Sequence, residues 1–162
     1  MLDVTEISAV IAAAGVLVGV AYYILDMRNQ SRVRQTELLA RLRSAFTSDD
    51  FLTALVKTRN LEFEDYNDFA KKYGSITLET PLNIAVLKIA NYFDEVGFLL
   101  HRGLVDADLI GEFMTFSIAA SWNKLKPLIE GYRKETNSRF SHWFEYLVNE
   151  MKKREQAGVV SG

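Results

Sequence analysis

ISAVIAAAGVLVGVAYYIL, residues 7–25, is the stretch that decides the fold of this chain. It carries no charged side chain, and Ser8 supplies its only aliphatic hydroxyl. Nine of its residues are large aliphatics, which together contribute about −4 kcal/mol on the membrane-insertion scale. As a helix the stretch is about 28 Å long, close to the hydrocarbon thickness of a bilayer. We therefore interpret it as a transmembrane helix.

Two other interpretations fit the stretch less well. A secretory signal peptide has positive charge before a shorter apolar run, whereas Asp3 and Glu6 precede this one. A core helix of a soluble domain remains an alternative. However, a helix that is apolar all round is hard to bury in a chain this short.

The charges around the span predict its orientation. No Lys or Arg precedes it, and five arginines follow within 18 residues, so the C-terminal side is expected to be cytoplasmic. Three of them, Arg28, Arg32 and Arg34, can also gain about 1 kcal/mol each near anionic lipid. Their role as a topology signal is sufficient to explain them, and we favour that explanation. The expected location is the inner cell membrane, with the N-terminus outside. The expected segments are a short extracytoplasmic N-terminus (1–6), the span (7–25), a juxtamembrane helical stalk (26–37), a cytosolic helical domain (38–156) and a disordered tail (157–162).

Small residues form a stripe on one side of the span. Ser8, Ala12, Gly15 and Gly19 are spaced by four, three and four residues, which keeps them on one helix face. Small side chains let two helices approach closely in lipid, and Gly15 and Gly19 form a GxxxG pair. The stripe predicts an association face, although Gly and Ala are also simply frequent in membrane helices.

Composition limits what the rest of the chain can be. After the span, roughly 130 of the 162 residues remain, enough for one domain with a core. The net charge of −2 gives no basic surface for nucleic acid, and the absence of cysteine excludes disulfides and thiolate metal sites.

The pattern after the span is helical throughout. An amphipathic pattern begins at Leu38, and Ser48, Thr80 followed by Pro81, and Asp106 are suitable helix starts. Pro127 is expected to kink or end its helix, and the last helix is expected to begin at Asn137 or Ser138. The predicted fold is all-α: an N-terminal transmembrane helix that continues into a cytosolic bundle of about five to six helices.

The helix expected at residues 81–102 is apolar on two sides, which is typical of a central helix. It would place Asn91, Glu95 and Arg102 close to packed surface. Such groups need partners, and an arginine such as Arg133 is a suitable partner for Glu95. The group is either a structural network or a polar site, and we favour the network.

Residue patterns that carry chemistry are scarce. His101 and His142 have no second histidine at metal spacing, and phosphate-binding glycine loops and nucleophile elbows are absent. Asp94 and Glu95 are adjacent, so on a helix they point about 100° apart. We predict no catalytic, cofactor-binding or metal-binding residues.

Part of the sequence resembles a known family. The run NYFDEVGFLLHRGLVD at residues 91–106, followed by Trp122, Pro127, Arg133 and FEYL at 144–147, is similar to a prokaryotic family known only as a domain of unknown function. The resemblance covers about residues 82–148. It implies one N-terminal span, a helical cytosolic domain and no established activity. It directs attention to a set of candidate polar-network residues: Asn91, Glu95, Arg102, Trp122, Arg133 and Glu145.

Two functions of different classes follow. The preferred one is a single-pass, membrane-anchored helical interaction module that binds itself or another membrane protein and needs no cofactor. The alternative is a membrane-bound enzyme or ligand-sensing effector in stress or phage defence, with a polar site around Asn91, Glu95 and Arg133.

Overall fold

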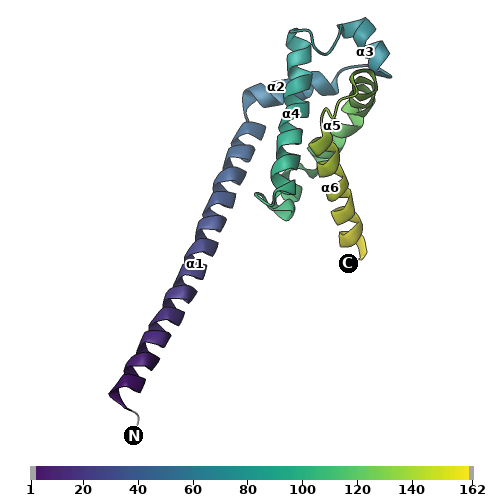
Figure 1. Cartoon of the computed structure of the whole chain (residues 1–162). Helices are drawn as coiled ribbons and strands as arrows, with labels where there is room; N and C mark the ends of the chain where they lie inside the picture. Colours follow the sequence, from purple (N-terminus) through teal and green to yellow (C-terminus); the bar gives the residue numbers. More distant parts are fainter. Residues whose placement is uncertain (1–2, 161–162) are drawn as a thin grey trace. The chain divides into compact units, whose positions relative to one another are not determined.

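The computed structural model describes residues 3–160 of the chain, without the side chains of residues 5–7, 9, 10, 31, 159 and 160. All regular secondary structure in this range is helical, which confirms the all-α prediction. The six helices are α1 (Val4–Phe46), α2 (Asp49–Arg59), α3 (Tyr66–Tyr73), α4 (Pro81–His101), α5 (Ala107–Thr136) and α6 (His142–Val160) (Figure 1). The chain divides into two compact units, Met1–Glu37 and Leu38–Gly162.

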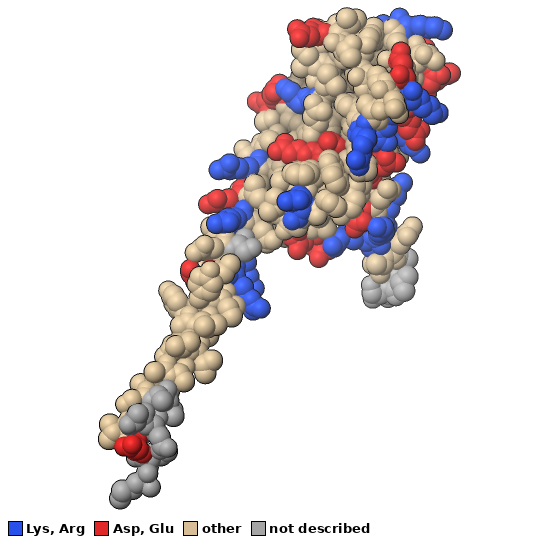
Figure 2. All heavy atoms as spheres, in the orientation of Figure 1, with Lys and Arg blue, Asp and Glu red and all other residues tan. Residues whose placement is uncertain are grey.

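The first unit consists of α1 up to Glu37. No Gly or Pro lies between Gly19 and the end of α1, so the helix continues without a break, as predicted. Every side chain from Ile11 to Gln30 is exposed, including that of Arg28. The part of α1 from Ile11 to Phe46, which begins with the uncharged residues 11–25, contains a window that is long and apolar enough to span a membrane, and no residue of that window is buried. Figure 2 shows this uncharged stretch as a run of tan side chains.

Caps predicted from the sequence fix the starts of three helices. The Ser48 hydroxyl accepts a hydrogen bond from the backbone N–H of Phe51, and the Thr80 hydroxyl accepts one from Asn83. The Asp106 carboxylate accepts from two backbone N–H groups in the first turn of α5. Each cap satisfies donors that a helix N-terminus leaves without an internal partner.

The later helices differ from the predicted boundaries at two places. Pro127 does not end its helix, since α5 continues through it, and the buried Leu125, Leu128 and Ile129 around it supply packing that offsets the lost hydrogen bond. The last helix begins at His142 rather than at Asn137 or Ser138, because both Asn137 and Ser141 have a positive φ.

The predicted disordered tail covers residues 157–162. Helix α6 continues to Val160, since Ala157 favours a helix and a single glycine costs only about 1 kcal/mol. The last two residues of that predicted tail lie outside the described residues.

Helix α4 is central to the second unit, as its two apolar sides predict. It contacts α2, α5 and α6, and its inward side chains, among them Val86, Ile89 and Phe93, are almost completely buried. The Tyr92 hydroxyl donates a 2.8 Å hydrogen bond to the carbonyl of Leu42, which ties the end of α1 into this core. Burial, with the charge of Glu95 added, raises the pKa of Tyr92 above its usual range, so the phenol stays protonated at neutral pH.

The closest approach between α4 and α6 depends on Gly97. A Cβ atom at this position would lie 2.0 Å from the carbonyl oxygen of Trp143 and 2.6 Å from its carbonyl carbon. Real Cβ atoms never come so close to backbone, so any larger residue must push the helices apart. This glycine therefore permits the most extensive helix contact in the unit.

Replacing Gly97 by alanine should lower the free energy of unfolding by about 2 kcal/mol, because the cost of overpacking exceeds the gain in helix propensity. The matched control is Gly111→Ala in α5, where the nearest atom to an added Cβ lies 3.6 Å away. That variant should be neutral or slightly stabilised. Thermal unfolding of the full chain in detergent, followed by circular dichroism, compares the two. Equal melting temperatures would contradict the proposed α4–α6 contact.

Candidate functional site

The six residues predicted as a polar network do not form one cluster. Asn91, Glu95 and Arg102 are all exposed on α4. They are four and seven residues apart, so they lie on one narrow stripe of the helix. Ile84 and Phe98 are exposed on the same stripe. This stripe is the solvent side of the central helix rather than a buried site.

Arg133 instead lies where α5 turns into α6. Its Nε donates a 2.7 Å hydrogen bond to the carbonyl of Phe140, and a terminal nitrogen donates a 3.0 Å bond to that of Ser141. Its other terminal nitrogen forms a 2.7 Å ion pair with Glu145. The expectation that Arg133 pairs with Glu95 is therefore wrong, because the planar guanidinium donates to three acceptors in and next to the α5–α6 turn.

These contacts stabilise a backbone that is otherwise unfavourable. Asn137 and Ser141 have φ values of 50° and 54°, in the left-handed region that side chains disfavour. Arg133 binds the two carbonyl groups that this turn directs toward it, and Glu145 neutralises its charge. We call Arg133 and Glu145, with the carbonyls of Phe140 and Ser141, the turn clamp. Its role is structural.

Trp122 belongs to the core rather than to a polar group. Its side chain is buried and meets the Phe144 ring edge-on, with ring centroids 5.1 Å apart. Phe144 in turn stacks on Phe93 at 5.0 Å. Trp122 therefore joins α5 to α6 and α4 through aromatic packing.

The sequence analysis missed the role of Asp94. Its carboxylate oxygen accepts hydrogen bonds of 2.8 and 3.0 Å from the backbone N–H groups of Trp143 and Phe144. Asp94 thus caps α6 from a different helix, and its charge lies at the positive end of the α6 dipole. Glu95, the next residue, is rotated about 100° around the helix axis from Asp94 and is exposed to solvent. No local signal reveals this role, because Ser141, which directly precedes His142, is itself a residue type that favours caps. Its φ of 54° is not that of a cap, and its buried hydroxyl has no hydrogen-bond partner among the described residues.

Both histidines of the chain lie against one indole ring. The ring centroids of His101 and His142 are 4.4 and 4.9 Å from that of Trp143. Phe98 and Tyr146 also contact this indole, at 5.9 and 6.0 Å. Among the described residues, no three His, Cys, Asp or Glu side chains are grouped so that they could hold a metal ion. The arrangement is an aromatic cluster that packs α4 on α6.

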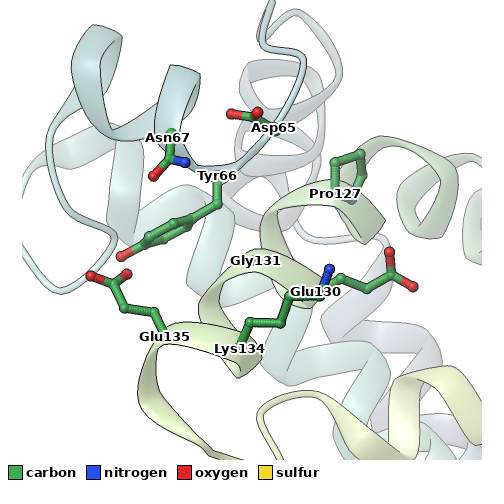
Figure 3. Close-up of a pocket in the computed structure, with 8 residues that line it drawn as sticks. All are labelled: Asp65, Tyr66, Asn67, Pro127, Glu130, Gly131, Lys134 and Glu135. Carbon is green, nitrogen blue, oxygen red and sulfur yellow. The ribbon is translucent and has the colours of Figure 1, made fainter.

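A hollow in the second unit lies between α3 and α5 and has a volume of about 630 Å³. Its lining carries three acidic side chains and one basic side chain among eight residues: Asp65, Tyr66, Asn67, Pro127, Glu130, Gly131, Lys134 and Glu135 (Figure 3). Gly131 allows α3 to approach, since a Cβ atom there would lie 2.2 Å from the Cβ of Tyr66. None of these residues belongs to the predicted polar network.

The hollow is poorly equipped for acid–base chemistry. The Tyr66 hydroxyl and the Glu135 carboxylate point toward one another, and the hydrogen bond between them, with some burial, raises the pKa of Tyr66 (Figure 3). The phenol therefore remains protonated at neutral pH and is not a base. Asp65 already caps α3 through the backbone N–H of Asp68. The hollow can offer hydrogen bonds and negative charge to a ligand, but no activated nucleophile.

Arg133→Ala should lower the free energy of unfolding by about 2 kcal/mol, because it leaves two turn carbonyls and a half-buried carboxylate without their donor. Arg139→Ala, in the same turn but exposed, is the control and should change little. Glu145→Gln should cost less than Arg133→Ala, since both carbonyl contacts remain. Chemical denaturation of the three variants measures these differences. An Arg139→Ala loss as large as that of Arg133→Ala would refute the clamp.

Comparison with known proteins gives one match. The family described as Domain of unknown function (DUF4760) matches residues 9–151. This confirms the expectation of a family without an assigned function and extends well beyond the region at 82–148 that carried the resemblance. No curated protein matches the chain, and no solved structure does.

Proposed function

We propose that this chain, which belongs to the DUF4760 family, is a membrane-anchored helical interaction module. The observation that carries the proposal is the exposure of the apolar part of α1. From Ile11 to Leu25 the helix has no charge and no buried side chain. Its large aliphatic side chains, such as Leu17 at 70% and Val18 at 69%, are mostly accessible.

Water is an unfavourable environment for this surface. Transfer of one Val, Leu or Ile side chain out of water is worth about 1.5–3 kcal/mol. The seven such residues in the range Ile11–Leu25 therefore stand for a transfer free energy on the order of 10 kcal/mol. A bilayer supplies the apolar surroundings along the whole length of the segment, and the helix satisfies its own backbone hydrogen bonds there.

The proposed location is the inner membrane of a prokaryotic cell, crossed once, with residues 1–6 outside and the helical domain in the cytoplasm. The support is the distribution of arginine: the basic side chains closest to the span all follow it. Arg28, Arg32 and Arg34 are exposed on α1, so they are available to lipid headgroups. We assign them first to topology and second to the membrane surface.

The proposed partner of the span is a second membrane helix, from another copy or from another membrane protein. The stripe Ser8, Ala12, Gly15 and Gly19 supports this. An added Cβ on Gly15 or Gly19 would have no atom within 4 Å, so the stripe is open for a helix to approach. The Ser8 hydroxyl donates to the carbonyl of Val4, and it therefore needs no partner from lipid.

We favour binding over catalysis because the polar residues with evident partners have structural roles. The alternative of an enzyme or effector with a site around Asn91, Glu95 and Arg133 has no support in the geometry. Arg133 is engaged in the turn clamp, and the other two residues are exposed on α4. A small ligand of that alternative would suit the hollow at Tyr66, whose lining is of mixed polarity.

Gly15→Ile and Gly19→Ile should each reduce self-association of the span several-fold, because a branched side chain keeps a second helix away. Ala14→Ile, on the opposite side of the same helix, is the matched control and should associate like the wild type. The measurement is chemical cross-linking of the full chain in mild detergent at fixed protein concentration. If both glycine variants cross-link like the control, the stripe is not an association face.

A further inference from the structure

We propose that the helical domain carries a second self-association surface on α2, which binds α2 of another copy in antiparallel orientation. Two apolar residues one turn apart, Leu52 and Val56, are 42% and 56% exposed there. Together with Asp49, Thr53 and Lys57 they line a shallow hollow along the outer face of the helix. The inner face of α2 is filled by Phe51, Ala54, Leu55 and Thr58, all buried.

Helix α5 extends this apolar surface at the C-terminal end of α2. The guanidinium of Arg59 lies 5.7 Å above the ring of Phe116 and donates a 3.3 Å hydrogen bond to the hydroxyl of Ser117. Phe116 is nevertheless 77% exposed, more than any other large apolar side chain described in the second unit. Single exposed apolar residues are ordinary, but here two lie one turn apart on α2 and a third lies beside Arg59 at the C-terminal end of the same helix.

The charges on α2 identify the occupant as a second copy. Asp49 and Lys57 stand at opposite ends of the outer face, and neither has an ion pair or side-chain hydrogen bond among the described residues. Two α2 helices that run antiparallel about a twofold axis near Thr53 bring Asp49 of each copy to Lys57 of the other. In that register Leu52 of one copy lies about 3 Å along the helix axis from Val56 of the other, because the Asp49–Lys57 pair is centred on residue 53 and the Leu52–Val56 pair on residue 54. The two apolar side chains are therefore close enough to pack.

The other charges of α2 are already used within one chain. Asp50 pairs with Lys88 of α4, and Arg59 is held by Phe116 and Ser117. The helix dipole by itself would favour an acid at the start of α2 and a base at its end. It does not account for an exposed apolar ridge between them, whereas an antiparallel pair accounts for both.

The contact needs the membrane tether, so it rests on the proposed function. A helix of 11 residues is about 16 Å long and offers much less than the roughly 800 Å² per partner of a standard interface. Two anchored copies, however, meet at an effective concentration that free copies do not reach. We therefore expect the α2 contact in membranes and not between copies diluted in detergent.

The chain contains no cysteine, so single cysteines report the contact directly. Thr53→Cys lies beside the proposed twofold axis and should form a disulfide-linked dimer when native membranes are oxidised with copper phenanthroline. Asn149→Cys, exposed on α6, is the matched control and should give at most a small fraction of that dimer. Equal dimer yields from both variants would overturn the proposal.

Charge variants in the Thr53→Cys background test the orientation. Asp49→Lys and Lys57→Glu each turn two attractions into repulsions and should lower the dimer yield roughly five- to tenfold. Co-expressed with different tags, the two variants should restore the wild-type yield in the mixed dimer, because both contacts are then attractive again. A parallel pair would instead leave the single variants at the wild-type yield, and that outcome would overturn the antiparallel arrangement.

Fractionation of the same membranes separates this inference from the proposed function. A chain that remains in the membrane but gives no specific Thr53→Cys dimer refutes the α2 contact and leaves the anchor intact. A chain found in the soluble fraction refutes the anchor, and the α2 contact falls with it.

Discussion

The main physical constraint on this chain is the uncharged surface of α1, which is unfavourable in water. Nothing in the first unit covers that surface, and its transfer free energy is comparable to the whole stability of a small domain. In the proposed membrane-anchored state, lipid covers this surface along the full length of the segment. The helix continues from there to Phe46 without Gly or Pro, so the anchor and the first core helix of the domain are one element.

Within the second unit, the polar residues are arranged to hold α6 on α4 and α5. Gly97 permits the close approach of α4 and α6, and Asp94 on α4 caps the N-terminus of α6. Arg133 and Glu145 stabilise the turn that connects α5 to α6. The charge of Asp94 lies at the positive end of the α6 dipole, and the charges of Arg133 and Glu145 form an ion pair. That pattern is typical of a structural framework, and it leaves the outer surfaces of α2, α4 and α5 for other molecules.

The features that local physics determines could be predicted from the sequence. An uncharged apolar run indicated the long first helix, and periodicity indicated the central helix. Residue types at helix starts indicated the caps at Ser48, Thr80 and Asp106. Features that depend on contacts between distant residues could not be predicted. Asp94 lies 49 residues from the N–H of Trp143 that it accepts from, and no local pattern relates the two. For Pro127, a local rule gave the wrong result, because buried neighbours on both sides outweigh the loss of one hydrogen bond.

The most direct test of the membrane anchor is the side on which each end of the chain is accessible. Asp3→Cys and Lys152→Cys, made separately in the cysteine-free chain, are labelled in intact cells with a membrane-impermeant maleimide. If α1 spans the membrane with the N-terminus outside, Asp3→Cys is labelled in intact cells, whereas Lys152→Cys is labelled only after the cells are opened. If the two cysteines behave alike, labelled together or protected together, α1 does not cross the membrane.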